Sequence, residues 1–142
     1  MQIKLPIQLF ELDEQNFHPV ISSEFSNGKK ANWVIDTGAS KSVFDKNRTV
    51  DYNLLGGVDE IYSATAADHP MTTSLAELKS FRLGAFEVSG LKVAIIDFSH
   101  INTIYRNANG PEISGLIGSD FLIKYNAVID YKKKVLKLNI LI

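Results

Sequence analysis

Residues 33–40 read Trp-Val-Ile-Asp-Thr-Gly-Ala-Ser, and the fold and function assigned to this chain depend on how this stretch is interpreted. Three apolar residues predict a strand that leaves the core, and Asp36 follows this strand at a tight turn. Gly38 permits the close backbone approach that such a turn needs, and Thr37 adds a hydroxyl with little rotamer freedom. Turn N–H groups that point at Asp36 would keep its carboxylate oriented and ionisable. The same residue types also form ordinary strand-ending turns, so the surrounding sequence must decide between the two interpretations.

The surrounding sequence predicts short β-strands. Apolar and polar residues alternate over residues 3–9, a period of two that is typical of a half-buried strand. The β-favouring runs 18–25 and 31–36 flank an Asn-Gly pair at residues 27–28, which is a strong hairpin signal. Similar runs recur every 8 to 12 residues or so along the chain, with turn residues between them. We therefore predict an all-β fold, either a small barrel or a sandwich of antiparallel strands.

Two segments depart from this pattern. Residues 99–112 are polar and rich in asparagine, which predicts a long surface loop or a short helical turn. Residues 121–125 follow Ser119 and Asp120, which are both good N-cap residues. We therefore expect little helix, with one short helix near the C-terminus.

Length and composition exclude several classes of protein. The chain has 142 residues, which predicts one domain over residues 1–142. Fifteen basic and sixteen acidic residues give a net charge of −1, so no general field attracts nucleic acid. The chain contains no cysteine, and its three histidines are too dispersed to predict a metal site. We expect no metal, no other cofactor and no nucleic-acid partner.

The sequence also bears on location. No run of about 18 apolar residues predicts a membrane span, and Lys4 and Pro6 interrupt the apolar start where a signal peptide would lie. We therefore expect no association with membranes. The expected location is cytoplasmic, or periplasmic if a leader has been removed.

Two later segments complete the pattern around Asp36. Residues 115–122 read Gly-Leu-Ile-Gly-Ser-Asp-Phe-Leu, and residues 127–131 read Ala-Val-Ile-Asp-Tyr. Together with the Asp-Thr-Gly-Ala-Ser turn, they resemble the retropepsin-like aspartic proteases, particularly their single-domain bacterial branch. The resemblance covers about residues 31–138. It implies a closed antiparallel barrel of the retropepsin type, with one short helix near the C-terminus.

The resemblance assigns roles to individual residues. Asp36 matches the catalytic aspartate, and Thr37 matches the residue whose hydroxyl bonds to the active-site turn of a partner subunit. Gly38 matches the glycine that shapes the turn and helps to bind the substrate backbone. Ala39, which is the retroviral form at its position, and Ser40 complete the turn. The family's segment that lies against this turn is matched by Leu116, Ile117 and Gly118. Asp120 matches the polar residue that opens the family's short helix, and its role there is structural.

The chemistry of this family needs two carboxylates that share one proton, because two like charges so close together cannot both ionise cheaply. The chain contains one Asp-Thr-Gly and no Asp-Ser-Gly, so a second copy must supply the other carboxylate. The apolar N- and C-terminal segments must either join the protomer's own sheet or pair as strands with a second copy. We favour the homodimer, with residues 3–5 and 138–142 pairing across the twofold axis. The predicted function is an aspartic endopeptidase that hydrolyses peptides or unfolded proteins.

The resemblance also places a substrate-covering flap between Val58 and Leu78. Its predicted tip residues are Ala64, Thr65, Ala66, Ala67, Asp68 and His69. Retroviral flap tips are rich in glycine, whereas no glycine occurs here from Val58 to Arg82, and Pro70 stiffens the segment. This departure leaves a second hypothesis open, a module of the same fold that binds peptides without cleaving them. A third hypothesis is a β-barrel that binds a small ligand.

Overall fold

The computed structural model describes residues 1–61 and 71–141, and the chain is mostly β, as predicted. The predicted flap tip, residues 64–69, lies outside the described residues. The strands are β1 (Gln2–Pro6), β2 (Gln8–Asp13), β3 (Asn16–Phe25), β4 (Lys30–Ile35), β5 (Val43–Asp45), β6 (Tyr52–Ile61), β7 (Met71–Leu78), β8 (Phe81–Leu83), β9 (Phe86–Val88), β10 (Lys92–Ile96), β11 (Gly115–Ile117), β12 (Val128–Asp130) and β13 (Val135–Asn139). The helical segments are η1 (Thr49–Asp51, a 3₁₀ turn), α1 (Ser99–Asn107) and α2 (Ser119–Lys124).

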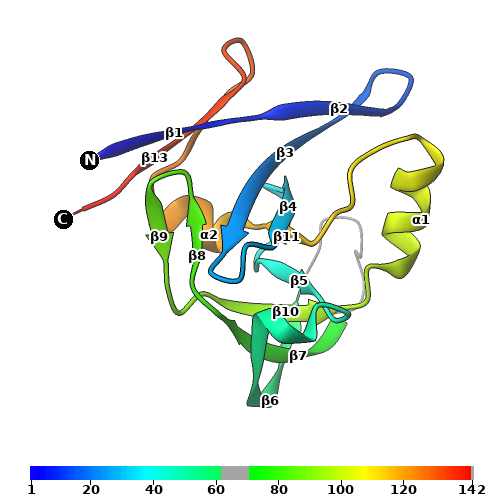
Figure 1. Cartoon of the computed structure of the whole chain (residues 1–142), viewed down its shortest axis with the longest axis vertical. Helices are drawn as coiled ribbons and strands as arrows, with labels where there is room; N and C mark the ends of the chain where they lie inside the picture. Colours follow the sequence, from blue (N-terminus) through cyan, green and yellow to red (C-terminus); the bar gives the residue numbers. More distant parts are fainter. Residues whose placement is uncertain (62–70, 142) are drawn as a thin grey trace.

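The main sheet is a curled half-barrel (Figure 1). Its strands follow the order β6-β7-β10-β5-β11-β4-β3-β8-β9, with β2 also paired to β3. Among the described strands no ladder joins β6 to β9, so the structure shows a curled sheet where the resemblance implied a closed barrel. The expectation of a purely antiparallel sheet is wrong, because β10 runs parallel to β5 and β11 runs parallel to β4. Parallel neighbours need a long crossover between them, and here many residues separate the members of each pair.

Strand β4 is buried on both faces, and this burial fixes the position of the Asp36 turn that follows it. Trp33 packs into the larger core, with its ring centroid 5.2 Å from that of Phe44 and 5.6 Å from that of Phe81. Val34 points the other way, into a smaller core that includes Phe98. This double burial explains the unbroken apolar run before Asp36, since alternation disappears when both faces of a strand are covered. The predicted hairpin between β3 and β4 is confirmed, with Val20 opposite Val34 and Glu24 opposite Lys30.

The two chain ends pair with each other inside one chain. Strand β1 is antiparallel to β13, from Gln2 opposite Asn139 to Pro6 opposite Val135, and β13 pairs with β12. Figure 1 shows the two termini side by side at one end of the molecule. The predicted pairing of these strands across a dimer axis is therefore corrected to pairing within the protomer. Long-range strand pairing and burial in the main core cover Leu136 and Leu138 within one chain, whereas Leu141 beyond β13 is 95% exposed.

The helices are partly as expected. The short helix predicted near the C-terminus is confirmed as α2. Its expected N-cap is wrong, because Ser119 and Asp120 lie inside the helix and Gly118 is the N-cap, with no side-chain cap hydrogen bond. Helix α1 is a further nine-residue helix, in a segment for which a loop or a short helical turn was predicted. The signal was present but weak: Phe98, Ile101 and Tyr105 recur at helical spacing within a polar stretch. No helix in the described residues is long and apolar enough to span a membrane.

Candidate active site

Asp36 lies immediately after β4, in a turn that holds one of its carboxylate oxygens. The Gly38 N–H donates to Asp36 Oδ1 at 3.0 Å, and the Ala39 N–H donates to the Asp36 backbone carbonyl at 3.1 Å. Asp36 is half-buried, while Thr37 and Gly38 are exposed. In the described part of the chain, Asp36 Oδ2 has no recorded hydrogen-bond partner. The turn therefore orients the carboxylate and leaves one oxygen available.

The segment 116–118 lies directly against this turn. Strand β11 pairs with β4 so that Leu116 faces Val34 and Ile117 faces Ile35. The Asp36 N–H then donates to the Ile117 carbonyl at 2.9 Å, which extends the ladder into the turn. Two segments about eighty residues apart in sequence thus form one backbone unit, with Asp36 at its end.

Gly118 is required here because backbone occupies the space of its missing side chain. A Cβ atom at this position would lie 2.8 Å from the Ala39 carbonyl oxygen and 2.8 Å from the carbonyl carbon of Lys41. The Ser119 N–H donates to the same Ala39 oxygen at 2.8 Å. The turn after Asp36 and the start of α2 are therefore packed backbone to backbone.

Asp120 joins the end of the turn to α2. Its carboxylate accepts the backbone N–H of Ser42 at 3.0 Å and the Ser42 hydroxyl at 2.8 Å. The Ser42 Oγ in turn accepts the Gly118 N–H at 3.0 Å. Sequence analysis did not single out Ser42, which is fully buried, because a lone serine between Lys41 and Val43 carries no recognisable pattern. Ser40 is exposed at the surface of this turn.

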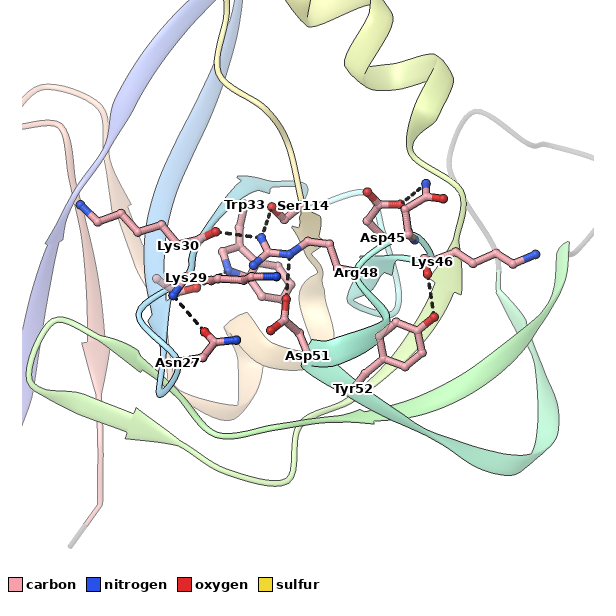
Figure 2. Close-up of polar contacts among 12 residues, drawn as sticks. Asn27, Lys29, Lys30, Trp33, Asp45, Lys46, Arg48, Asp51, Tyr52 and Ser114 are labelled. Atoms are coloured by element: carbon pink, nitrogen blue, oxygen red, sulfur yellow. Dashed lines mark hydrogen bonds and ion pairs between the residues drawn. The ribbon is translucent and has the colours of Figure 1, made fainter.

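A buried ion pair supports the strands behind the site, as Figure 2 shows. The Arg48 Nε donates to Asp51 Oδ2 at 2.8 Å, and its Nη1 donates to the Lys30 carbonyl and to the Ser114 hydroxyl. The Asp51 side chain is only 1% exposed. Lys30 opens β4 and Ser114 directly precedes β11, so Arg48 ties together the two strands that deliver Asp36 and Ile117. The sequence offered no signal for this role, because Arg48 meets its carbonyl and hydroxyl partners only after folding.

A groove of about 450 Å³ opens beside Asp36. It runs between the start of β3, helix α1 and the β4–β11 pair, and its walls are mainly apolar. The apolar residues of its walls include Phe17, Val34, Ile101, Ile104, Ile113 and Leu116. No sequence pattern predicted this groove, because its walls come from four separate stretches of the chain, within residues 12–19, 34–36, 101–105 and 113–116.

One polar pair lies in the wall of the groove. The Tyr105 hydroxyl is hydrogen bonded to Nδ1 of His18, and Nε2 of His18 lies 3.2 Å from Asn16 Oδ1. Since an amide oxygen can only accept, Nε2 of His18 is the donor to Asn16. Burial raises the pKa of Tyr105 to about 12, so this hydroxyl stays protonated over the ordinary pH range.

Other candidate groups have structural partners of their own. Hydrogen bonds from the Ser99 hydroxyl and the Ser99 N–H, and then from Asn47, lower the pKa of the exposed Asp97 to about 2. Asp130 accepts the Lys133 N–H in the turn before β13. Over residues 1–61 and 71–141 no three His, Asp or Glu side chains are grouped so that they could hold a metal ion. The segment that resembles a flap forms the β6–β7 hairpin, whose predicted tip lies outside the described residues.

Comparison with known proteins agrees with this arrangement. A family profile described as aspartyl protease matches residues 22–121, which include the Asp36 turn and the segment beside it. The chain belongs to the aspartyl protease family. Among curated proteins, none matches this chain.

Two solved structures resemble this chain in fold, and one of them is a retropepsin-like protein. One is the crystal structure of a retropepsin-like aspartic protease from Rickettsia conorii, with a TM-score of 0.56 and 18% sequence identity, over 97% of this chain and 89% of the other. The other is the crystal structure of edgp, with a TM-score of 0.59 and 10% identity, over 97% of this chain and 46% of that one. This chain therefore spans less than half the length of edgp. At such low identity, both likenesses concern the fold alone.

Proposed function

We propose that this protein is an aspartic endopeptidase, in which Asp36 and the partner subunit's Asp36 form the catalytic pair of a homodimer. The observation that carries the proposal is the Asp36 turn. The Gly38 N–H donates to Oδ1 at 3.0 Å, the Ile117 carbonyl accepts the Asp36 N–H at 2.9 Å, and Oδ2 has no hydrogen-bond partner among residues 1–61 and 71–141. A preorganised carboxylate of this kind needs little rearrangement before it reacts. The membership of this chain in the aspartyl protease family also supports hydrolysis of peptide bonds as the reaction.

The proposed reaction is hydrolysis of a peptide bond by water. One Asp36 carboxylate is ionised and removes a proton from a water molecule, whose oxygen attacks the carbonyl carbon of the substrate. The protonated carboxyl of the other subunit donates its proton to the carbonyl oxygen, which gives a neutral tetrahedral diol. The first carboxyl then gives its proton to the amide nitrogen while the second recovers one from the diol. The C–N bond breaks, and the products are a carboxylic acid and an amine.

The pairing of β1 with β13 within one chain does not itself require a second copy, so the terminal strands are not the main support for the proposed dimer. Its strongest support is the chemical need for a second carboxylate, combined with the single Asp-Thr-Gly turn. Thr37 is exposed on that turn and is therefore available to bond with the partner subunit's turn. The outer edges of β1 and β12 are the parts of the terminal sheet that a second copy would meet.

The test is cleavage of unfolded casein between pH 3 and pH 7 by wild-type protein, Asp36→Asn and Asp130→Asn. Asp130→Asn is a matched control because Asp130 caps a turn before β13. We expect cleavage by wild type and by the control, and none by Asp36→Asn with an unchanged oligomeric mass. Equal cleavage by Asp36→Asn, or an active monomer at every concentration, would overturn the proposal.

A peptide-binding module without hydrolysis is the second candidate function. It is favoured by the glycine-free sequence from Val58 to Arg82 and by the chain ends, which do not require a second copy. Binding of unfolded peptides by a monomer that cleaves none of them would select this candidate over the endopeptidase.

A further inference from the structure

We propose that a polar pocket at the start of β4 and β11 binds a phosphate group, either free phosphate or that of a small phosphorylated molecule. The pocket has a volume of about 420 Å³ and is lined by Lys29, Lys30, Asn32, Arg48, Glu112 and Ser114. It lies at the opposite end of β4 from Asp36, about 20 Å away at roughly 3.3 Å per residue of strand. The inference concerns a second site, and it holds whether or not Asp36 takes part in hydrolysis.

The charge of the pocket favours an anion. Three of its six lining residues are basic and one is acidic, in a chain whose net charge is −1. Lys29 and Lys30 are exposed, and neither ammonium group has an ion pair among residues 1–61 and 71–141. Glu112 is also exposed, and its backbone carbonyl accepts the Asn32 side-chain amide at 2.9 Å. Positive charge remains in excess even with Asp51 paired to Arg48, so a phosphate group, with a charge of about −1.5 to −2 at pH 7, is attracted more strongly than a carboxylate.

Arg48 presents a fixed guanidinium group to this pocket. Its Cζ atom lies 5.6 Å from the ring centroid of Phe25 and 5.6 Å from that of Phe44, and its Nε donates to Asp51 at 2.8 Å. In the described part of the chain, no hydrogen bond is recorded from Nη2, so two N–H donors of an already oriented group remain available. A planar guanidinium matches the geometry of phosphate oxygens, and its preorganisation lowers the entropy lost on binding.

Ser114 adds a buried hydroxyl beside this guanidinium. The residue is 3% exposed, and its Oγ accepts a hydrogen bond from Arg48 Nη1 at 2.7 Å. Among the described residues, the proton of this hydroxyl has no recorded acceptor. A hydroxyl that accepts one hydrogen bond can still donate one, and a buried donor without an acceptor is unfavourable. An oxygen of a phosphate in the pocket would accept this proton.

Lys29 completes the set of donors. Figure 2 shows its side chain extended towards the ion pair of Arg48 and Asp51, whereas the side chain of Lys30 extends the other way. The Lys29 backbone is fixed, because its N–H donates to the Asn27 side chain at 2.9 Å. No aromatic or aliphatic residue lines the pocket, so no side chain is placed to stack on a base or to pack against an acyl chain. The ligand that fits is therefore small and polar apart from its phosphate group.

Occupation of the pocket should also stabilise the fold. A phosphate bound by Lys29 and Ser114 would join the residue before β4 to the residue before β11, and so would add bonds between these two strands. A ligand that binds only the folded chain, at a concentration tenfold above its Kd, multiplies the folding equilibrium constant by about 11. For a chain of this size, this factor raises Tm by roughly 4 °C.

The experiment is isothermal titration calorimetry of the whole chain at pH 7.5 with inorganic phosphate, glycerol 3-phosphate or acetate, at constant ionic strength. We expect both phosphates to bind, and acetate to bind at least about tenfold more weakly because it carries a single charge. Tighter binding of glycerol 3-phosphate would identify a small phosphorylated molecule as the preferred ligand, whereas tighter binding of inorganic phosphate would identify free phosphate. Thermal denaturation with each anion then measures the rise in Tm.

The variants are Lys29→Gln and Ser114→Ala, with Lys132→Gln as the matched control. Lys132 is an exposed lysine in the turn between β12 and β13, outside the pocket, where two further lysines follow it. We expect Lys29→Gln to raise the Kd for phosphate about tenfold and Ser114→Ala about fivefold, and Lys132→Gln to leave it unchanged. Lys29 is exposed and makes no side-chain contact that the fold needs, so this variant remains informative if Ser114→Ala unfolds.

Three results would overturn the inference. They are no binding of either phosphate below about 10 mM, acetate binding as tightly as phosphate, and equal weakening by Lys29→Gln and Lys132→Gln, which would indicate a general effect of charge. Cleavage of casein is measured separately, so none of these results bears on the endopeptidase proposal.

Discussion

Gly118→Ala tests whether backbone packing behind Asp36 holds the turn that follows this residue. Gly118 has φ −95° and ψ −177°, which alanine adopts without strain, so any effect comes from the added Cβ alone. That atom would meet three backbone atoms, at 2.8 Å, 2.8 Å and 3.0 Å, and backbone in a paired turn cannot move aside cheaply. Overpacking of this kind costs up to about 3 kcal/mol.

Part of this cost is offset in the unfolded state, because replacing glycine by alanine removes about 0.7 kcal/mol of chain entropy. The net loss in the free energy of unfolding is then about 2 kcal/mol, and for a chain of this size Tm falls by roughly 6 °C. Ala39 and Lys41, which the new atom touches, are part of the turn that holds Asp36. Their displacement should therefore also lower kcat in any hydrolysis assay, since misplacement by about 1 Å can cost 100-fold.

The measurement is thermal and urea denaturation of Gly118→Ala beside Gly56→Ala. Gly56 is the control because a Cβ atom there would have no heavy atom within 4 Å. We expect Gly56→Ala to be as stable as wild type or slightly more stable. If Gly118→Ala melts within 1 °C or so of wild type, the packing argument is wrong, and if both variants lose equal stability, the cause is not the contact with Ala39 and Lys41.

Three further predictions follow from individual side chains. Asp51→Ala leaves the Arg48 charge without its buried partner and should lower the free energy of unfolding by about 3 kcal/mol in urea titrations, whereas an exposed pair would lose well under 1 kcal/mol. Asp97 has a folded pKa of about 2, below its ordinary value of 3.8, so it stabilises the fold above pH 4 or so and this contribution disappears as the pH falls towards 2. Asp97→Asn should therefore show a shallower loss of Tm between these pH values than wild type, and parallel curves would contradict the assignment. Ala39→Ser offers a hydroxyl to the ionised carboxylate pair of the proposed enzyme, so the pH optimum for casein cleavage should move from mildly acidic to more acidic values; an unchanged or higher optimum would count against a role of residue 39 in tuning the pair.

Much of the site could be predicted from the sequence, because its determinants are local. The turn at Asp36 needs only Gly38 and the apolar run before it. The short helix α2 begins at Ser119 and has Asp120 in its first turn, where an acidic side chain is favourable. The mostly β character follows from alternation and from turn residues such as those at 27–28. In each case, the residues that interact are neighbours in the chain.

Only the tertiary structure decided which distant segments meet. The sequence of the two apolar ends is compatible with pairing inside one chain or across a dimer, and the fold pairs β1 with β13 across more than 130 residues. Ser42 and Asp120, Arg48 and Ser114, and Asn102 and Ile113 are likewise brought together by the sheet order, which no local pattern encodes. The groove beside Asp36 belongs to this second group, since β3, α1 and β11 each contribute one part of its wall. Local propensities determine the pieces, whereas the competition among long-range pairings and burial determines how they surround the carboxylate.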